Sequence, residues 1–169
     1  MRIHPSPGGT AYYSLCTSDG PTSWYWAWGP EVWEDATGES MKFDLDPAVP
    51  CSSVVEKQIQ WEGYFFCPAS ALGCYIKWIW SWHNDPVHGV HKNIEDAKIV
   101  FDYSKWSNIT DAQRRAASAH EMGHGVGLDD HSEAACQITS IMGLIGTPPC
   151  LEGPTFWDAV AAMCNHSYC

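Results

Sequence analysis

The stretch from residue 120 to residue 131 reads HEMGHGVGLDDH, and it decides which fold and chemistry to expect. His120 and His124 are four residues apart, so on a helix both imidazoles lie on one face, one turn apart. Two imidazoles placed in this way can bind one zinc ion at ~2.0–2.1 Å. Glu121 lies about 100° round the helix from His120, which suits a general base acting on a water better than a third ligand. The spacing therefore predicts a catalytic zinc site.

A catalytic zinc site needs a third protein ligand and leaves its fourth position for water. Gly127 is placed to end the helix with a positive φ, so that the chain turns back toward the metal. Asp130 or His131 could then complete the site. Strict spacing favours Asp130, and His131 is the alternative third ligand. A helix cap upstream, the glycine and a further ligand at the right distance together argue against a chance occurrence of the motif.

Helix and strand signals surround this stretch. Thr110 and Gln113 have the form of a capping box, which predicts a helix over residues 112–126. The stretch up to Gly29 is rich in Gly, Ser, Pro and aromatic residues and predicts loops with short strands. Further helices are expected at residues 30–36, with Pro30 in the first turn and Gly38 closing the helix, and at residues 155–164; strands are expected at 41–46, 75–82 and 99–103. We therefore expect an α+β protein with a single domain over residues 1–169.

Composition narrows the class of protein. The net charge is −11, with nine Lys and Arg residues against twenty carboxylates, which does not supply the basic face that a nucleic acid needs. No apolar run approaches the ~20 residues that span a bilayer, so no membrane span is expected. The H-E-x-x-H spacing at residues 120–124, which is typical of metalloproteases, gives a protein or peptide substrate as the expected partner. The protein is expected to be a monomer.

Eight cysteines are scattered along the chain, which favours disulfides and an oxidising, extracellular location. Eight cysteines allow 105 pairings, so the connectivity stays open. The two local loops Cys67–Cys74 and Cys136–Cys150 are the pairs that we expect. Residues 1–9 carry no apolar segment of the secretory type, so a secreted protein would have lost its signal earlier or would use another export route.

At this point the chain resembles the metzincin clan of metalloproteases, whose pattern is H-E-x-x-H-x-x-G-x-x-H or D. Residues 120, 121, 124, 127 and 130 fill the named positions of that pattern in order. The clan also has a Met-turn under the ligands, and residues 140–143, with Met142, are similar to it. The resemblance implies a twisted mixed β-sheet, an active-site helix, a Met-turn and a C-terminal helix. It divides the chain into an upper subdomain at about residues 1–127 and a lower one at about 128–169, and implies a secreted zinc endopeptidase with Glu121 as general base.

The third ligand distinguishes two metzincin branches. With Asp130 followed by His131, the chain is similar to the snapalysin family, which also carries a disulfide beyond the motif that Cys136 and Cys150 would suit. Matrixins are the second choice, because residues 127–132 match their Gly-Leu-x-His-Ser pattern with one inserted residue and His131 as ligand. One departure concerns Leu144, which stands where several metzincin families have a Tyr. Zinc or backbone amides would then have to stabilise the developing oxyanion.

Two further features carry weaker signals. A histidine-rich stretch, with His83, Asp85, His88 and His91, could hold a second metal, although an ordinary surface loop is favoured. Trp78, Trp80 and Trp82 alternate, so they share one face of a strand; a core face is favoured over an exposed binding strip. In metzincins the strand before the last edges the cleft and pairs with extended substrate, and residues 75–82 are the candidate for it. The tryptophans also support the alternative function, a carbohydrate- or protein-binding adhesion module with a structural zinc.

Overall fold

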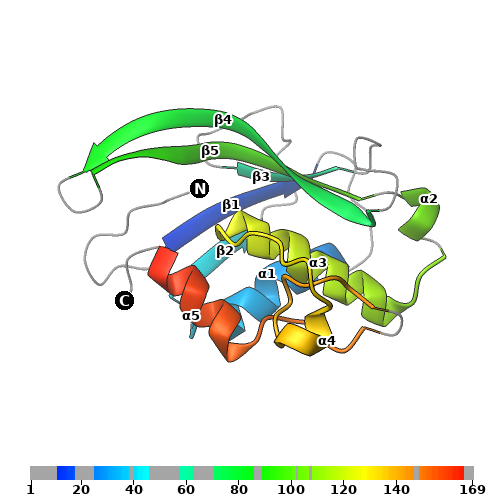
Figure 1. Ribbon diagram of the computed structural model, residues 1–169. Helices are drawn as coiled ribbons and strands as arrows, with labels where there is room; N and C mark the ends of the chain where they lie inside the picture. Colours follow the sequence, from blue (N-terminus) through cyan, green and yellow to red (C-terminus); the bar gives the residue numbers. More distant parts are fainter. Residues whose placement is uncertain are drawn as a thin grey trace.

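Five strands form one mixed sheet in the computed structural model, which describes residues 11–17, 25–38, 40–45, 58–62, 71–85, 89–101, 103–106, 108–146 and 149–165. The strands are β1 (Ala11–Thr17), β2 (Met41–Leu45), β3 (Gln58–Glu62), β4 (Gly73–Asp85) and β5 (Gly89–Phe101), in the order β2-β1-β3-β5-β4. The pairs β1–β2, β1–β3 and β3–β5 are parallel, whereas β4 runs antiparallel to β5. The sheet therefore ends at β4 on one side (Figure 1).

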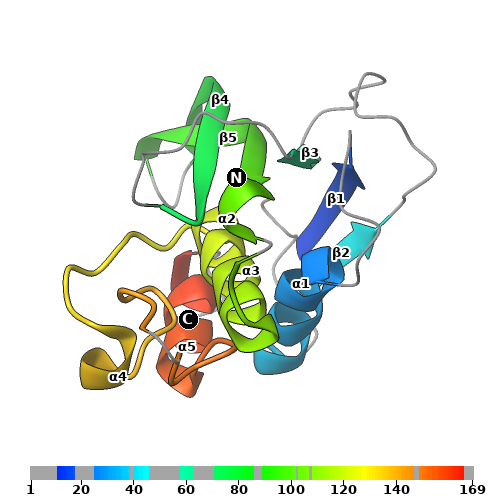
Figure 2. The same ribbon diagram turned by 90° about the vertical axis from the view of Figure 1, so that its right-hand side faces the viewer.

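The helices lie on one face of this sheet (Figures 1 and 2). They are α1 (Tyr25–Ala36), α2 (Tyr103–Trp106), α3 (Asp111–Gly125), α4 (Ala135–Ile138) and α5 (Phe156–Asn165). Figure 2 shows α3 beneath β4 and β5 and α1 beneath β1 and β2, with α4 and α5 further from the sheet. The prediction of a mixed helix and strand protein is confirmed. Within the described ranges, no helix is both long and apolar enough to cross a membrane, as expected.

The core lies between the sheet and the two long helices. Trp33 of α1, Met41 of β2 and Ile99 of β5 are fully buried together with Met122 of α3. The Trp33 indole donates a hydrogen bond of 2.8 Å to the carbonyl of Ala119 in α3, so the buried indole is satisfied. The two helices are thereby joined both by packing and by a polar contact.

Helix α3 begins and ends as its sequence predicts. Thr110 accepts from the Gln113 amide while Gln113 accepts from the Thr110 amide, which confirms the capping box. At the other end Gly127 has φ 92°, as predicted. Its amide donates to the His124 carbonyl and the Leu128 amide donates to the Gly123 carbonyl, which is the bonding pattern of a Schellman motif. This ending turns the chain directly from the helix into the segment that carries Asp130.

The predicted strand at 41–46 and helix at 155–164 agree with β2 and α5 to within one residue at each end. The helix predicted at 30–36 is longer, because α1 already begins at Tyr25 and holds Pro30 in its interior. Pro30 lacks an amide hydrogen, but it and Trp33 are fully buried, and this packing outweighs the loss of one backbone hydrogen bond. The prediction that the stretch up to Gly29 contains only loops and short strands is therefore wrong at its end.

Both strands predicted at 75–82 and 99–103 are longer in the structure. The second strand also begins and ends earlier in the chain than predicted. They correspond to β4 and β5, which pair along 13 residues each, and Tyr103 already belongs to α2. Pairing across the hairpin supports polar stretches that no local alternation indicates, such as Asn93 opposite Ser81. The short elements β3, α2 and α4 were not predicted, because each is too brief to show a periodic pattern.

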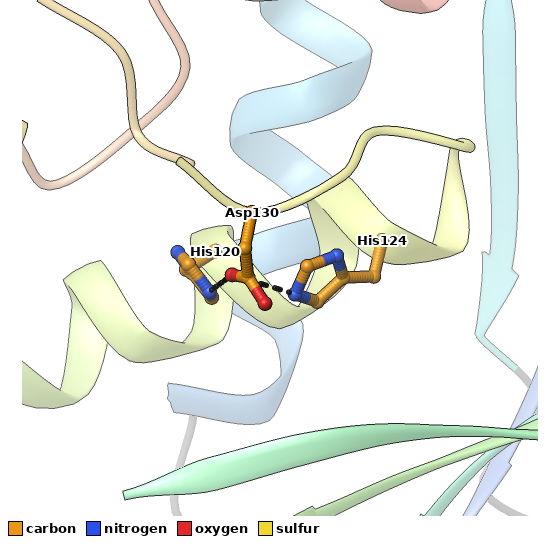
Figure 3. Close-up of side chains that lie close together, drawn as sticks. All are labelled: His120, His124 and Asp130. Atoms are coloured by element: carbon orange, nitrogen blue, oxygen red, sulfur yellow. Dashed lines mark ion pairs between the residues drawn. The ribbon is translucent and has the colours of Figure 1, made fainter. Parts of the chain in front are cut away.

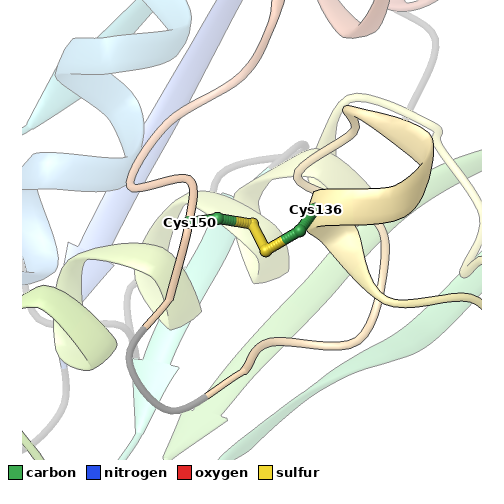
Figure 4. The surroundings of a disulfide bond; sticks show 2 residues. All are labelled: Cys136 and Cys150. Carbon is green, nitrogen blue, oxygen red and sulfur yellow. A yellow bond between two sulfur atoms is a disulfide. The ribbon is translucent and has the colours of Figure 1, made fainter.

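The predicted disulfide between Cys136 and Cys150 is confirmed, and it joins α4 to the chain that precedes α5 (Figure 4). Its Cα atoms lie 5.6 Å apart. Cys74 and Cys164 are also disulfide-bonded. Cys67 lies outside the described residues, so the predicted pair Cys67–Cys74 stays a prediction.

Candidate metal centre

Three side chains converge beside α3. His120 and His124 extend from successive turns of the helix, and Asp130 reaches them from the segment that follows it (Figure 3). The Asp130 Oδ1 atom lies 3.1 Å from Nε2 of His120 and 3.4 Å from Nε2 of His124. One potential ligand atom from each residue lies within 4.8 Å of the others. Of the two candidates for third ligand, the structure thus brings Asp130 to the histidines, whereas His131 lines the same cleft without belonging to this group.

Each imidazole is oriented by a backbone carbonyl. Nδ1 of His120 lies 2.8 Å from the Ile141 carbonyl oxygen, and Nδ1 of His124 lies 2.8 Å from the Leu128 carbonyl oxygen. A carbonyl oxygen only accepts, so both Nδ1 atoms must carry the proton, and in a neutral ring Nε2 then presents a lone pair. Two nitrogen lone pairs and a carboxylate oxygen therefore face one another. Such a set of acceptors requires a cation or a shared proton between them, so these residues fit a divalent metal such as zinc.

Burial keeps His120 in the form that binds metal. Its side chain is 13% exposed, and burial, together with the nearby His124, lowers the pKa of His120 below its ordinary value, although the bond to Ile141 and the nearby Asp130 raise it. Neutral imidazole is the form that ligates a metal. Asp130, by contrast, is 71% exposed, so it reaches the site from the solvent side.

Glu121 is a buried carboxyl group that lines the same cleft as the two histidines and Asp130. It is buried at 6% exposure, and within the described part of the chain its Oε2 atom has no hydrogen-bond partner. Burial, and then the negative charge of Asp130, raises the pKa of Glu121 to about 8. A buried carboxyl group with an unsatisfied oxygen at the edge of a cleft is typical of a functional site rather than of a core.

The cleft in front of these residues has a volume of about 870 Å³. One wall comes from residues 71–75, which lie just before and at the start of β4, and the other from residues 143–145, which follow Met142. Since β4 is the outer strand, the prediction that residues 75–82 edge the cleft is correct for Tyr75, and the strand already borders the cleft from Gly73. The Tyr75 ring also lies 6.0 Å from the His124 ring, centroid to centroid.

Met142 lies in a tight turn beneath α3. Its side chain is 1% exposed, and the Gly143 amide donates to the Ser140 carbonyl across the turn. Two glycines make this packing possible, and sequence reasoning missed both. A Cβ on Gly123 would lie 2.2 Å from the Met142 sulfur, and a Cβ on Gly143 would lie 2.7 Å from the Ala135 backbone. For Gly123, the only signal in the sequence is that a glycine directly precedes the second histidine of the motif.

The segment that carries Asp130 is tied to the Met142 turn by backbone hydrogen bonds. The His131 amide donates to the Met142 carbonyl, and the Leu144 amide donates to the Glu133 carbonyl. The Ala135 amide completes the set by donating to the Leu144 carbonyl. This parallel pairing fixes which residue after Gly127 faces the histidines, since it engages the backbone of His131 and leaves the side chain of Asp130 on the side of His120 and His124.

The weaker candidates lie mostly outside the described part of the structure. His83 and His91 are paired in the β4–β5 hairpin and Asp85 ends β4, but their side chains are not described, and His88 is not described at all. The side chains of Trp78, Trp80 and Trp82 are likewise outside the described set. The register shifts between Lys77 and Trp80 interrupt the strict alternation from which a common face was inferred.

A scan against protein-family models gives no match to this chain, and a search of curated proteins finds none with significant sequence similarity. The resemblance to metzincins therefore rests on the motif at residues 120–131 and on the turn at Met142.

Proposed function

We propose that this protein is a secreted zinc-dependent endopeptidase with a metzincin-type catalytic domain, most similar to the snapalysins. The observation that carries the proposal is the meeting of three lone pairs, from His120, His124 and Asp130, beside the buried carboxyl group of Glu121. These four residues line one cleft, so the ligand set and the base would face the same substrate.

His120 and His124 would hold the ion through Nε2, and Asp130 would hold it through a carboxylate oxygen. Zinc bound there supplies Lewis-acid chemistry, which lowers the pKa of a water and stabilises the negative charge developing on a peptide carbonyl. Glu121 takes a proton from the attacking water at Oε2 and passes it to the nitrogen of the leaving amine. Glu121 must be ionised to do so, and a neighbouring positive charge favours the ionised form.

The walls of the cleft suit an extended peptide. The edge strand β4 offers backbone amides and carbonyls on its outer side, and a peptide that adds a strand there gains main-chain hydrogen bonds. Leu144 is 61% exposed and stands on the opposite wall with Ile145, where it contacts side chains of the substrate. We expect the peptide to lie between β4 and this apolar wall, with its scissile bond above Glu121.

Several features of the fold support a metzincin-type domain. The strand before the last, β4, borders the cleft, the helix α3 carries the motif, and α5 closes the described part of the chain. Met142 lies beneath the ligand-bearing turns, as a Met-turn would. The disulfide Cys136–Cys150 beyond the motif is the feature implied by the snapalysin family, and it suits an extracellular protein.

The alternative is an adhesion module in which zinc is structural. A structural zinc site is closed by four protein ligands. Over the described residues, the group beside α3 has three members and opens onto the cleft, which favours a catalytic site. The buried and unsatisfied Glu121 carboxyl would also have no purpose in a structural site.

The test compares zinc content and peptide cleavage in the wild type and two Glu variants. Glu121→Gln keeps the size of the side chain and removes the base, so we expect bound zinc to stay near one ion per chain while kcat falls by about 10²–10⁴. Glu133→Gln, at an exposed position outside the cleft, is the matched control and should cleave like the wild type. Cleavage by a chelator-treated protein at the wild-type rate would refute the proposal.

A further inference from the structure

Asp158, in the first turn of α5, is buried at 5% exposure and accepts four hydrogen bonds. Its Oδ2 atom accepts from the Ile141 amide at 3.0 Å and from the Thr155 amide and hydroxyl at 2.8 and 2.9 Å. Its Oδ1 atom accepts from the Ser140 hydroxyl at 2.5 Å. Two carboxylate oxygens offer about four acceptor sites, so the donors around Asp158 match an ionised carboxylate.

Two of these donors, the Ser140 hydroxyl and the Ile141 amide, belong to the turn that carries Met142. The Ser140 hydroxyl also links Asp158 to the candidate metal centre. The Ser140 oxygen accepts from the Met142 amide at 3.1 Å. That amide and the Ile141 carbonyl belong to the same peptide group. The Ile141 carbonyl in turn accepts from Nδ1 of His120 at 2.8 Å. A continuous path of hydrogen bonds therefore runs from His120, through one peptide group and one hydroxyl, to the carboxylate of Asp158.

All the donors on this path point the same way, toward the carboxylate. Hydrogen bonds arranged in series polarise one another, so the negative charge at Asp158 makes the Ile141 carbonyl a stronger acceptor. A stronger acceptor at Nδ1 fixes the ring tautomer and makes Nε2 a better ligand, as a directly bonded carboxylate does in many zinc sites. His124 differs, because its Nδ1 bonds a carbonyl only four residues along the chain.

We propose that Asp158 is a positioning residue of the metal centre, which acts on His120 through Ser140 and the Ile141–Met142 peptide. This inference rests on the proposed zinc site. It joins the C-terminal helix to the ligand set, so the strength of zinc binding depends on the correct docking of α5.

A purely structural role for Asp158 is the rival explanation, and it uses different partners. Thr155 accepts from the Asp158 amide while Asp158 accepts from the Thr155 amide, which forms a capping box at the start of α5. The path of hydrogen bonds from His120 to Asp158, called the relay below, uses Oδ1 of Asp158 and Ser140. The helix cap uses Oδ2 of Asp158 and Thr155. One substitution on each side therefore separates the two roles.

The experiment compares Ser140→Ala, Thr155→Ala and Asp158→Asn in two measurements: zinc affinity by competition with a chelator, and thermal unfolding of the metal-free protein. We expect Ser140→Ala to bind zinc about 10-fold more weakly, at the lower end of the effect of outer-sphere partners. Thr155→Ala should unfold at a lower temperature and keep wild-type zinc affinity. Asp158→Asn removes the charge at nearly constant size, and it should lower both the zinc affinity and the unfolding temperature. Wild-type zinc affinity in folded Ser140→Ala would overturn the relay.

A third readout needs no zinc and keeps the two proposals separate. In the metal-free wild type, ¹⁵N NMR of the imidazoles should show His120 with its proton on Nδ1, and Ser140→Ala should shift that resonance toward a weaker hydrogen bond. An unchanged resonance would overturn the relay by itself. If the wild type binds no zinc, but Ser140→Ala still shifts the His120 resonance, the proposed function is overturned and the hydrogen-bonded path from His120 to Asp158 stands.

Discussion

The sulfur atom of Met142 lies directly against the backbone of Gly123, at the centre of the H-E-x-x-H turn. A Cβ on Gly123 would stand 2.2 Å from that sulfur and 3.2 Å from Cζ2 of Trp33. Met142 and Trp33 are both fully buried, so neither can move aside into solvent. The glycine between the two histidines is therefore required by the turn that carries Met142.

We predict that Gly123→Ala destabilises the protein despite the better helix propensity of alanine. The propensity gain is about 1 kcal/mol, whereas overpacking a dense core costs about 1–3 kcal/mol, and a 2.2 Å contact belongs at the upper end of that cost. The net loss should be about 1–2 kcal/mol in urea denaturation. Gly153→Ala, where the nearest side-chain atom would be 3.5 Å away, is the matched control and should change stability by less than about 0.5 kcal/mol.

A double-mutant cycle checks the cause. In a Met142→Ala background the sulfur is absent, so Gly123→Ala should no longer be destabilising. If the alanine costs the same free energy of unfolding in both backgrounds, then Met142 is not what excludes a side chain at position 123.

The parts of the site that sequence could predict are those built by one helix. His120, Glu121 and His124 are placed by helical spacing, and the capping box and Gly127 mark the helix ends, so local rules suffice for them. The choice between Asp130 and His131 could not be made in this way. It depends on the pairing of the His131 backbone with the chain at Met142, a contact between segments that local patterns do not encode.

Residues that act across the fold were missed for the same reason. Gly73 and Gly123 matter only because another element packs against them, and Asp158 reads in sequence as an ordinary helix-capping residue. The hairpin β4–β5 was predicted too short because its polar stretches are paired through the backbone with the opposite strand, which no local alternation indicates. Pro30 suggested a helix start, although burial allowed α1 to begin five residues earlier, at Tyr25.

The proposed third ligand gives a prediction that distinguishes Asp130 from its neighbour His131. Asp130→Ala should weaken zinc binding by more than about 100-fold, beyond the effect of any outer-sphere partner, because the ion would keep only two protein ligands. Asp130 is 71% exposed, so the metal-free protein should unfold as the wild type does. His131→Ala should bind zinc normally, since the structure engages His131 through its backbone amide. The opposite result, measured by chelator competition, would place the chain nearer to the matrixin pattern.

Gly73 in β4 gives a prediction about the general base. A Cβ there would lie 2.9 Å from Cδ1 of Phe101 and 3.2 Å from Cγ of Glu121. The Phe101 ring, which also packs on Trp106 at 4.4 Å between ring centroids, or the β4 backbone must therefore shift, and the Glu121 side chain must give way by a few tenths of an ångström. Gly73→Ala should then lower kcat by about 10–100-fold, as small displacements of catalytic groups do.

The zinc content of Gly73→Ala should stay at the wild-type level, because the three atoms nearest to the new methyl group belong to Phe101 and Glu121 and not to a ligand. Steady-state kinetics and metal analysis on the same preparation test both halves of this prediction. A variant that loses zinc together with activity would show that Gly73 supports the fold of the site and not the position of Glu121.

The disulfide Cys136–Cys150 gives the last prediction. The two cysteines are 14 residues apart, and the loop between them contains the Met142 turn and the cleft wall at Leu144. Closing a loop of this size stabilises a protein by about 3 kcal/mol in the chain-entropy account. The double variant Cys136→Ala/Cys150→Ala should lose about 2–4 kcal/mol in urea denaturation, and it avoids leaving a single free thiol.

Zinc affinity should fall in this double variant as well, because the loop holds both the Ile141 carbonyl that orients His120 and the Leu144 backbone that pairs with the segment carrying Asp130. The Thr110→Ala variant is the matched control. Its free energy of unfolding should fall by about 1 kcal/mol, because the cap of α3 is removed. Every contact of the loop stays in place, so its zinc affinity should be unchanged. If the double variant loses stability and keeps full zinc affinity, the disulfide stabilises the chain without ordering the metal centre.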